Sequence, residues 1–128
     1  MTSHYTLHIS SEFSAAHSVR GYEGRCARVH GHNYKITVEV KANTLNHLGF
    51  VIDYYDVKTV LQKIIEQLDH YDINNIQPFD VINPTAENIA AWFYKNLAEQ
   101  LNNEQISVAA VILSETEDFF VRYTEIES

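Results

Sequence analysis

The sequence is poor in cysteine and in basic residues, and each shortage narrows the possible functions. Cys26 is the only cysteine among 128 residues, so no internal disulfide can form and the fold does not depend on an oxidising compartment. Lysine and arginine together number 9 against 17 aspartates and glutamates, which leaves a net charge of -8. A charge of that sign argues against nucleic acid or an anionic membrane as a general partner.

Long apolar runs are also missing. The longest extends only from Val108 to Leu113, whereas a membrane-spanning helix needs about 20 apolar residues. Residues 1–8 lack the apolar run of a signal peptide, so we expect a cytoplasmic protein. Internal repeats, linkers and low-complexity tracts are absent as well, which predicts a single domain over residues 1–128.

Four segments have the composition of strands. Apolar and polar residues alternate over residues 5–13 and 34–42, and this period of two predicts half-buried strands. Residues 17–29, with two glycines and mixed charge, predict a loop between them. Residues 106–113 form a nearly continuous apolar run, which predicts a strand buried on both faces. Residues 119–126 predict a last strand. Burial of the second face predicts that a partner subunit covers it.

Helical spacing of apolar residues predicts two helices between the second and third strands. Asp53 is the expected N-cap of the first helix, which should end around residues 69–72. Thr85 is the expected N-cap of the second, which should end at residues 102–103. The order strand, strand, helix, helix, strand, strand predicts an α+β fold, in which a four-stranded antiparallel sheet carries two helices on one face.

The residues with the most chemistry lie between Cys26 and His32, in the sequence Cys-Ala-Arg-Val-His-Gly-His. His30 and His32 are two residues apart, so on an extended backbone both imidazoles project from the same face. Together with His17 they form a set of three imidazoles, which can hold zinc tetrahedrally and leave its fourth position open. Gly31 lacks a Cβ and therefore lets its backbone approach a metal or ligand closely.

Two other interpretations of this segment stay open. Cys26 could be a fourth zinc ligand, which would make the site closed and structural. A His-X-His pair can also be two surface histidines with no metal. The nearby loop contains Arg20, Arg25 and Arg28, which favours an anionic substrate beside the site.

Two further positions could take part in chemistry. Asp69 precedes His70, and a neighbouring carboxylate can orient a histidine or raise its pKa; the alternative is a histidine that stabilises a helix end. Glu115 follows an apolar strand, where it is either a buried carboxylate that binds ring N–H groups or an ordinary acid at a strand end.

These motifs together resemble the 6-pyruvoyltetrahydropterin synthase family over nearly the whole chain. The resemblance rests on five stretches in the family's order: Phe13-Ser-Ala-Ala-His17, Cys26-x-x-x-His30-Gly-His32, Leu68-Asp69-His70, Asn83-Pro-Thr85-x-Glu87-Asn88 and Glu115-Thr116. The three residues between Cys26 and His30 look like the 6-carboxytetrahydropterin synthases of queuosine biosynthesis. The pyruvoyl-forming members typically have a longer gap.

The resemblance implies the tunnelling fold (T-fold), whose sheets close into a barrel in a trimer. Two trimers would stack into a hexamer, with active sites at subunit interfaces. It also implies a role for eight residues: zinc ligands His17, His30 and His32, the general base Cys26 with its partners Asp69 and His70, and the pterin-binding residues Glu115 and Thr85.

The implied activity is a zinc-dependent lyase reaction. It would convert 7,8-dihydroneopterin triphosphate to 6-carboxy-5,6,7,8-tetrahydropterin, with loss of triphosphate and acetaldehyde. Two alternatives are a 6-pyruvoyltetrahydropterin synthase, which stops after elimination of triphosphate, and a catalytically idle subunit that binds pterin or metal. Release of acetaldehyde separates the first of these from the carboxy-forming reaction, and turnover of any dihydropterin excludes the second.

Overall fold

Alternating apolar residues build a four-stranded antiparallel sheet, which the computed structural model describes within residues 4–126. The strands are β1 (Tyr5–His17), β2 (His30–Ala42), β3 (Ser107–Ser114) and β4 (Phe120–Tyr123), and they lie side by side in that order. Two helices, α1 (Tyr54–Ile65) and α2 (Ala86–Leu101), separate β2 from β3 in the chain. The predicted fold class and the order ββααββ are therefore confirmed.

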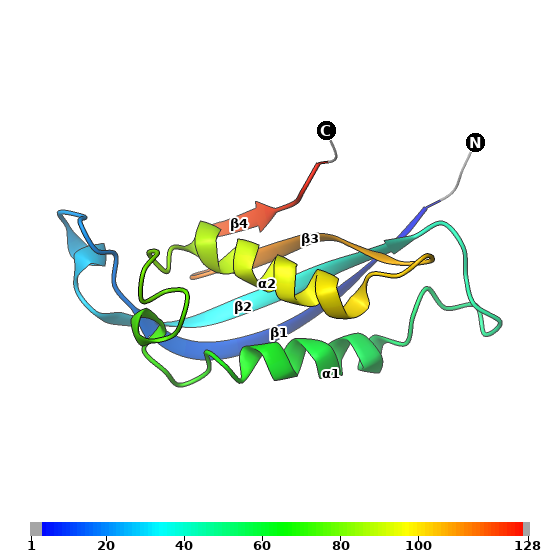
Figure 1. Cartoon of the computed structure of the whole chain (residues 1–128), viewed down its shortest axis with the longest axis horizontal. Coiled ribbons are helices and arrows are strands. Elements are labelled where there is room, and N and C mark those ends of the chain that lie inside the picture. Colours follow the sequence, from blue (N-terminus) through cyan, green and yellow to red (C-terminus); the bar gives the residue numbers. More distant parts are fainter. Residues whose placement is uncertain (1–3, 127–128) are drawn as a thin grey trace.

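Both helices lie along the same face of the sheet, as Figure 1 shows. Helix α1 packs against β1, and α2 packs against β3 and β4. The core forms between the helices and the inward residues of the strands, and its largest fully buried side chains include Tyr34, Ile36, Leu61, Phe93 and Leu97. Among the described residues no helix is long and apolar enough to cross a membrane.

The two predicted helix caps are confirmed. The Asp53 carboxylate accepts a hydrogen bond from the Tyr55 backbone N–H at 2.8 Å. The Thr85 hydroxyl accepts one from the Asn88 backbone N–H at 3.2 Å. Each bond satisfies one of the donors that a helix N-terminus leaves unpaired, so both helices begin where the sequence indicates.

The opposite face of the sheet is polar. The hydroxyls of Ser10 and Thr37 lie 2.8 Å apart across β1 and β2, and Arg122 donates two hydrogen bonds of 3.0 Å to the Glu39 carboxylate. On this face Ile112 of β3 pairs with Thr37 of β2 and with Arg122 of β4, and it is only half-buried. Within this chain the second row of β3 is thus only half-buried, beside those polar side chains, and its cover by a partner subunit stays a prediction.

The predicted strand limits also need correction. β1 reaches His17 and β2 starts at His30, so only residues 18–29 form the loop. Residues 14–17 and 30–33 lack a clear apolar alternation, yet their backbones pair in register, with His17 opposite His30. β3 is shifted by one residue, and β4 is limited to four residues instead of the eight predicted.

The predicted end of α1 is wrong as well. The last helical residue is Ile65, and residues 66–70 form turns, in which the Leu68 N–H donates to the Ile65 carbonyl at 2.9 Å. Leu68 is fully buried although it lies outside the helix, so the helical spacing of apolar residues extends beyond the helix itself. Asp69 and His70 consequently lie in a turn rather than at a helix end.

Candidate metal centre

The pairing of β1 with β2 brings three histidines together. His17 is directly opposite His30, and His32 is opposite Ala15 in the same register. Alternation then puts His17, His30 and His32 on the helix side of the sheet. One ligand atom from each lies within 4.8 Å of the others, and the ring centroids are 4.6 to 5.1 Å apart. The prediction that His30 and His32 share a face is confirmed.

Backbone carbonyls fix the orientation of two of these rings. The Nδ1 atom of His17 is 2.6 Å from the Pro84 carbonyl oxygen, and that of His30 is 2.7 Å from the Arg28 carbonyl oxygen. A carbonyl can only accept, so each Nδ1 carries the proton and each Nε2 of a neutral ring keeps a free lone pair. This is the arrangement typical of histidines whose other nitrogen binds a metal.

The free nitrogens of His17 and His32 are buried, and neither makes a hydrogen bond among the described residues. His17 is only 2% exposed. Burial also lowers the pKa of His32, although the neighbouring Glu115 carboxylate opposes the effect, and a neutral imidazole is the form that binds metals. Three converging imidazoles with unused lone pairs fit a metal ion.

Cys26 is not part of this cluster. It lies on a short 3-10 helix, η1 (Arg25–Ala27), and is exposed. Among the described residues the group of side chains that could hold a metal consists of the three histidines alone. A metal held by these histidines would therefore have three ligands from the described part of this chain.

A cavity of about 990 Å³ adjoins the cluster. Its floor is the polar face of β1 and β2, at Glu12, Ser14, Gly31, Asn33 and Lys35. One wall is the Asp69-His70 turn, and the opposite wall is the turn from Ser114 to Glu117. His32 also lines the cavity, which therefore adjoins one member of the histidine cluster.

Asp69 and His70 interact directly. Asp69 Oδ1 is 3.0 Å from His70 Nδ1 and accepts a hydrogen bond of 2.9 Å from the Ser14 backbone N–H. This backbone donor, helped by His70, lowers the pKa of Asp69 below its usual value. His70 has a left-handed φ of 64°, and its backbone N–H donates to the Ser14 carbonyl at 2.6 Å. The pair is thus attached to β1, with its imidazole turned toward solvent.

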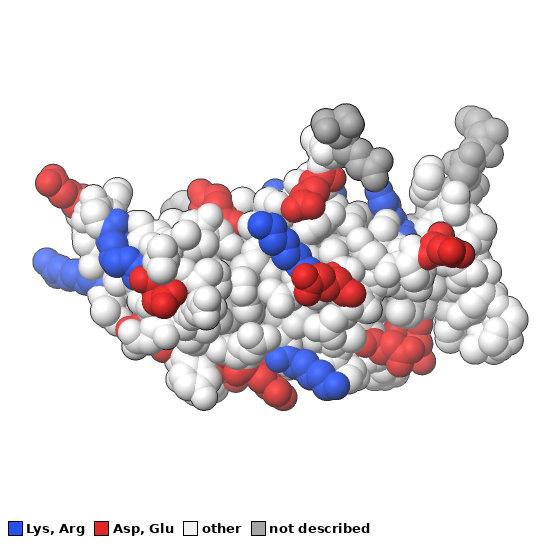
Figure 2. Space-filling model, viewed as in Figure 1, with Lys and Arg blue, Asp and Glu red and all other residues white. Residues whose placement is uncertain are grey.

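The remaining predicted residues lie in different surroundings. Glu115 lines the cavity, with Oε2 at 3.5 Å from His32 Nε2. Thr85 is the cap of α2 and does not line the cavity. Arg20 donates to the carbonyls of Phe79 and Ile82, whereas Arg25 and Arg28 are exposed. Figure 2 shows basic side chains at the end of the molecule formed by this loop.

Tyr34 and Ser14 are two members of the site that the sequence analysis did not identify. The Tyr34 hydroxyl is buried and has no hydrogen-bond partner within residues 4–126; its ring is 5.3 Å from that of His32, and burial raises its pKa. Its position two residues after His32, on the same face of β2, is a signal that could have found it. The bond from Ser14 to Asp69 spans 55 residues and has no such signal.

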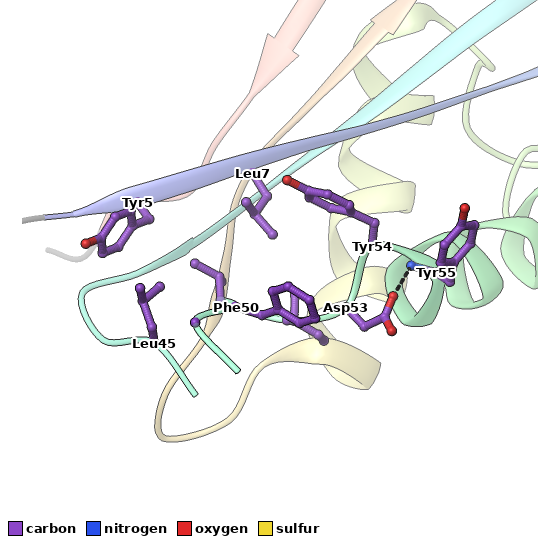
Figure 3. Close-up of a pocket in the computed structure, with 10 residues that line it drawn as sticks. Tyr5, Leu7, Leu45, Phe50, Asp53, Tyr54 and Tyr55 are labelled. Atoms are coloured by element: carbon purple, nitrogen blue, oxygen red, sulfur yellow. Dashed lines mark hydrogen bonds between the residues drawn. The ribbon is translucent and has the colours of Figure 1, made fainter. Parts of the chain in front are cut away.

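A second hollow, of about 340 Å³, lies between the start of β1 and the segment that leads into α1. Figure 3 shows that Tyr5, Leu7, Leu45 and Phe50 contribute to its walls. Its one carboxylate, Asp53, is already used to cap α1. The hollow therefore lacks a group of titratable side chains comparable to that around His32.

Comparisons with known proteins agree with this geometry. The family model described as 6-pyruvoyl tetrahydropterin synthase matches residues 6–126. A putative 6-carboxy-5,6,7,8-tetrahydropterin synthase of Archaeoglobus fulgidus is 37% identical over 79% of this chain and 84% of that one. A 6-carboxy-5,6,7,8-tetrahydropterin synthase of Haemophilus influenzae is 31% identical over 91% and 98%.

A solved structure shows that the fold is similar as well. The 6-pyruvoyl tetrahydropterin synthase of Caenorhabditis elegans superposes with a TM-score of 0.87 over 98% of both chains, at 22% identity. The family model covers nearly all of the sequence. The chain therefore belongs to the 6-pyruvoyl tetrahydropterin synthase family.

Proposed function

We propose that this chain is a zinc-dependent lyase of queuosine biosynthesis, which converts 7,8-dihydroneopterin triphosphate to 6-carboxy-5,6,7,8-tetrahydropterin and releases triphosphate and acetaldehyde. The observation that carries the proposal is the cluster of His17, His30 and His32, one member of which, His32, also lines a cavity that the Asp69-His70 pair borders. The names of the relatives in Archaeoglobus and Haemophilus support the carboxy product.

In this proposal His17, His30 and His32 hold the metal, and their hydrogen bonds to backbone carbonyls keep two of the rings in the binding tautomer. Zinc held there would supply a Lewis acid that acidifies the C–H group next to the oxygens of the substrate side chain. Glu115 would accept hydrogen bonds from the N–H groups of the pterin ring, because its carboxylate lines the same cavity.

Proton transfer is assigned to Cys26, Asp69 and His70. The thiolate of Cys26 would remove the proton from carbon. His70 would pass protons to or from the substrate, while Asp69 fixes its orientation through the 3.0 Å contact between Oδ1 and Nδ1. Within one chain Cys26 is exposed and does not line the cavity. We therefore propose a trimer or hexamer, in which Cys26 of one copy meets the Asp69-His70 pair of another.

The test is to incubate the zinc-replete protein with 7,8-dihydroneopterin triphosphate and to identify the products by mass spectrometry, with a separate assay for acetaldehyde. Carboxytetrahydropterin formed together with acetaldehyde is the expected result. A pyruvoyl product without acetaldehyde would assign the chain to the pyruvoyl synthases. If the protein turns over no dihydropterin, the alternative function, a catalytically idle subunit that binds metal or pterin, would be supported instead.

A further inference from the structure

The Pro84 carbonyl is the hydrogen-bond partner of the most buried histidine in the cluster. Its oxygen is 2.6 Å from Nδ1 of His17, whose side chain is only 2% exposed, and Pro84 is buried as well. A neutral imidazole carries its proton on one nitrogen only, and the partner of the other nitrogen decides which one that is. The direction of this single carbonyl therefore decides whether Nε2 of His17 has a lone pair for a metal.

Two asparagine side chains hold the backbone that leads to this carbonyl. The Asn83 side chain accepts a hydrogen bond of 2.9 Å from the Arg20 N–H and donates one of 2.9 Å to the Arg20 carbonyl. Asn88, in the first turn of α2, donates from its side chain to the Asn83 carbonyl at 2.9 Å. Asn83 is thus fixed both through its side chain and through its own carbonyl.

The residue types around Pro84 remove most of the remaining freedom. The proline ring locks the φ angle of Pro84, and it confines Asn83, the residue before it, to extended conformations. Thr85 follows as the N-cap of α2, and its hydroxyl accepts from the Asn88 N–H at 3.2 Å. The backbone is therefore held on both sides of Pro84, which leaves its carbonyl directed at His17.

Asn74 binds the same loop in a similar way but does not act on the Pro84 carbonyl. The Ser18 N–H donates to Asn74 Oδ1 at 2.8 Å, and Asn74 Nδ2 donates to the Ser18 carbonyl at 3.0 Å. Asn74 and Asn83 are both half-buried. The chain thus contains two asparagines that make the same pair of bonds to the loop, and only one of them directly precedes Pro84.

We infer that Asn83 and Asn88 are positioning residues of the zinc site. They hold the Pro84 carbonyl against Nδ1 of His17, so that Nε2 stays free to bind the metal. The inference rests on the proposed function, because it takes zinc to be the ion held by the histidines. Partners that orient a metal-binding histidine typically change the metal affinity by about 10- to 100-fold when they are removed.

The experiment compares the wild type with Asn83→Ala, Asn88→Ala and the control Asn74→Ala. Competition with a chelating indicator of known affinity measures zinc binding. The ¹⁵N chemical shifts of the His17 ring, assigned with the help of His17→Ala, report its tautomer in the zinc-free protein at about pH 8.5, where histidine in water is neutral. Melting temperatures of the zinc-free proteins report the loss of the hydrogen bonds themselves.

We expect Asn83→Ala and Asn88→Ala to bind zinc about tenfold more weakly than the wild type and to mix the two tautomers of His17. Asn74→Ala should keep the wild-type zinc affinity and tautomer, although it should melt at a lower temperature, as Asn83→Ala does. If Asn83→Ala does not fold, Asn88→Ala decides, because it loses a single bond.

Wild-type zinc affinity and tautomer in Asn83→Ala and Asn88→Ala would overturn the inference alone. Equal weakening of zinc binding in Asn74→Ala would also overturn it, by assigning the effect to the loop and not to the Pro84 carbonyl. A wild type that binds no zinc would overturn the proposed function together with this inference.

Discussion

Ser14 holds Asp69 through its backbone: the Ser14 N–H donates to Asp69 Oδ1 at 2.9 Å, and the Ser14 carbonyl accepts from the next residue, His70, at 2.6 Å. A further bond runs from the Ala16 N–H to the Tyr71 carbonyl at 3.0 Å. The turn after α1 is thus attached to the end of β1 over several residues. This attachment explains how His70 keeps a left-handed backbone, which is unfavourable for a residue with a Cβ.

The bond between Ser14 and Asp69 predicts a pH-dependent contribution to stability. The pKa of Asp69 is lower in the folded chain than in the unfolded one, so its contribution is complete above about pH 4 and is lost as the pH falls through the folded-state pKa. We expect Asp69→Asn to be about 1 kcal/mol less stable at pH 7, a modest figure because the carboxylate is 36% exposed.

Urea unfolding from pH 7 to pH 2.5 measures this difference. The gap between wild type and Asp69→Asn should close below about pH 4. Asp80→Asn, at an exposed position, is the control and should follow the wild type throughout. A gap of the same size at pH 2.5 would show that Asp69 stabilises the turn without using its charge.

The separation of Cys26 from the histidine cluster predicts that two variants differ in zinc binding. His17→Ala removes the most buried of the three imidazoles, so it should reduce zinc binding to well below one equivalent per chain. Cys26→Ala removes an exposed thiol outside the cluster and should keep a full equivalent while it loses activity. Elemental analysis after dialysis measures both.

Removal of the metal should also destabilise the wild type. A ligand at 1,000 times its dissociation constant stabilises the folded state by about 4 kcal/mol, and the buried His17 and the half-buried His30 and His32 would lose their common partner when a chelator is added. We therefore expect a chelator to lower the melting temperature of the wild type and of Cys26→Ala, with little effect on His17→Ala. Loss of zinc from Cys26→Ala would instead identify the thiol as a fourth ligand.

The buried hydroxyl of Tyr34 predicts that its removal will not lower the stability of the protein. Its hydroxyl is buried without a partner in the described structure, and an unpaired buried hydroxyl costs about 1–3 kcal/mol. Tyr34→Phe should therefore leave the stability of the metal-free protein unchanged or raise it. Tyr94→Phe is the matched control, because the Tyr94 hydroxyl donates to the Val108 carbonyl at 3.3 Å, and it should lose about 1 kcal/mol. Equal losses in the two variants would mean that the Tyr34 hydroxyl has a partner, such as a buried water.

The sequence predicted the parts of this fold that depend on neighbouring residues. Alternation from Tyr34 to Ala42 identified β2, and the two-residue spacing of His30 and His32 predicted their shared face, which the structure confirms. The helix caps Asp53 and Thr85 could also be predicted from the sequence, because a cap accepts a hydrogen bond from a backbone N–H two or three residues away.

Features that depend on long-range pairing could be predicted only in part. The set of His17, His30 and His32 was predicted and the structure brings the three together, but the sequence does not state the register of β1 and β2 that puts His17 opposite His30. The helical spacing of Leu68 after Ile64 placed the end of α1 too late, since a buried position can recur at that spacing outside a helix. For the same reason the attachment of Asp69 to Ser14 could only be found in the structure.

The three arginines of the loop, which the sequence analysis grouped as one site for an anionic substrate, should behave differently when they are replaced. Arg20 donates to the carbonyls of Phe79 and Ile82 at 2.7 and 2.9 Å and so ties the loop to the segment before α2. We expect Arg20→Ala to lose about 1–2 kcal/mol of stability in urea unfolding. Arg25→Ala and Arg28→Ala change exposed side chains and should stay within about 0.5 kcal/mol of the wild type.

Kinetics then tell whether the two exposed arginines bind the triphosphate. If they do, Arg25→Ala and Arg28→Ala should each raise KM several-fold and leave kcat nearly unchanged, because a contact to a remote anionic group stabilises ground state and transition state alike. The effect should shrink at high salt, which screens exposed charges. A KM that stays at the wild-type value in both variants would exclude these arginines from substrate binding. The triphosphate would then have to contact other donors around the cavity, and Lys35 on its floor is the positively charged candidate.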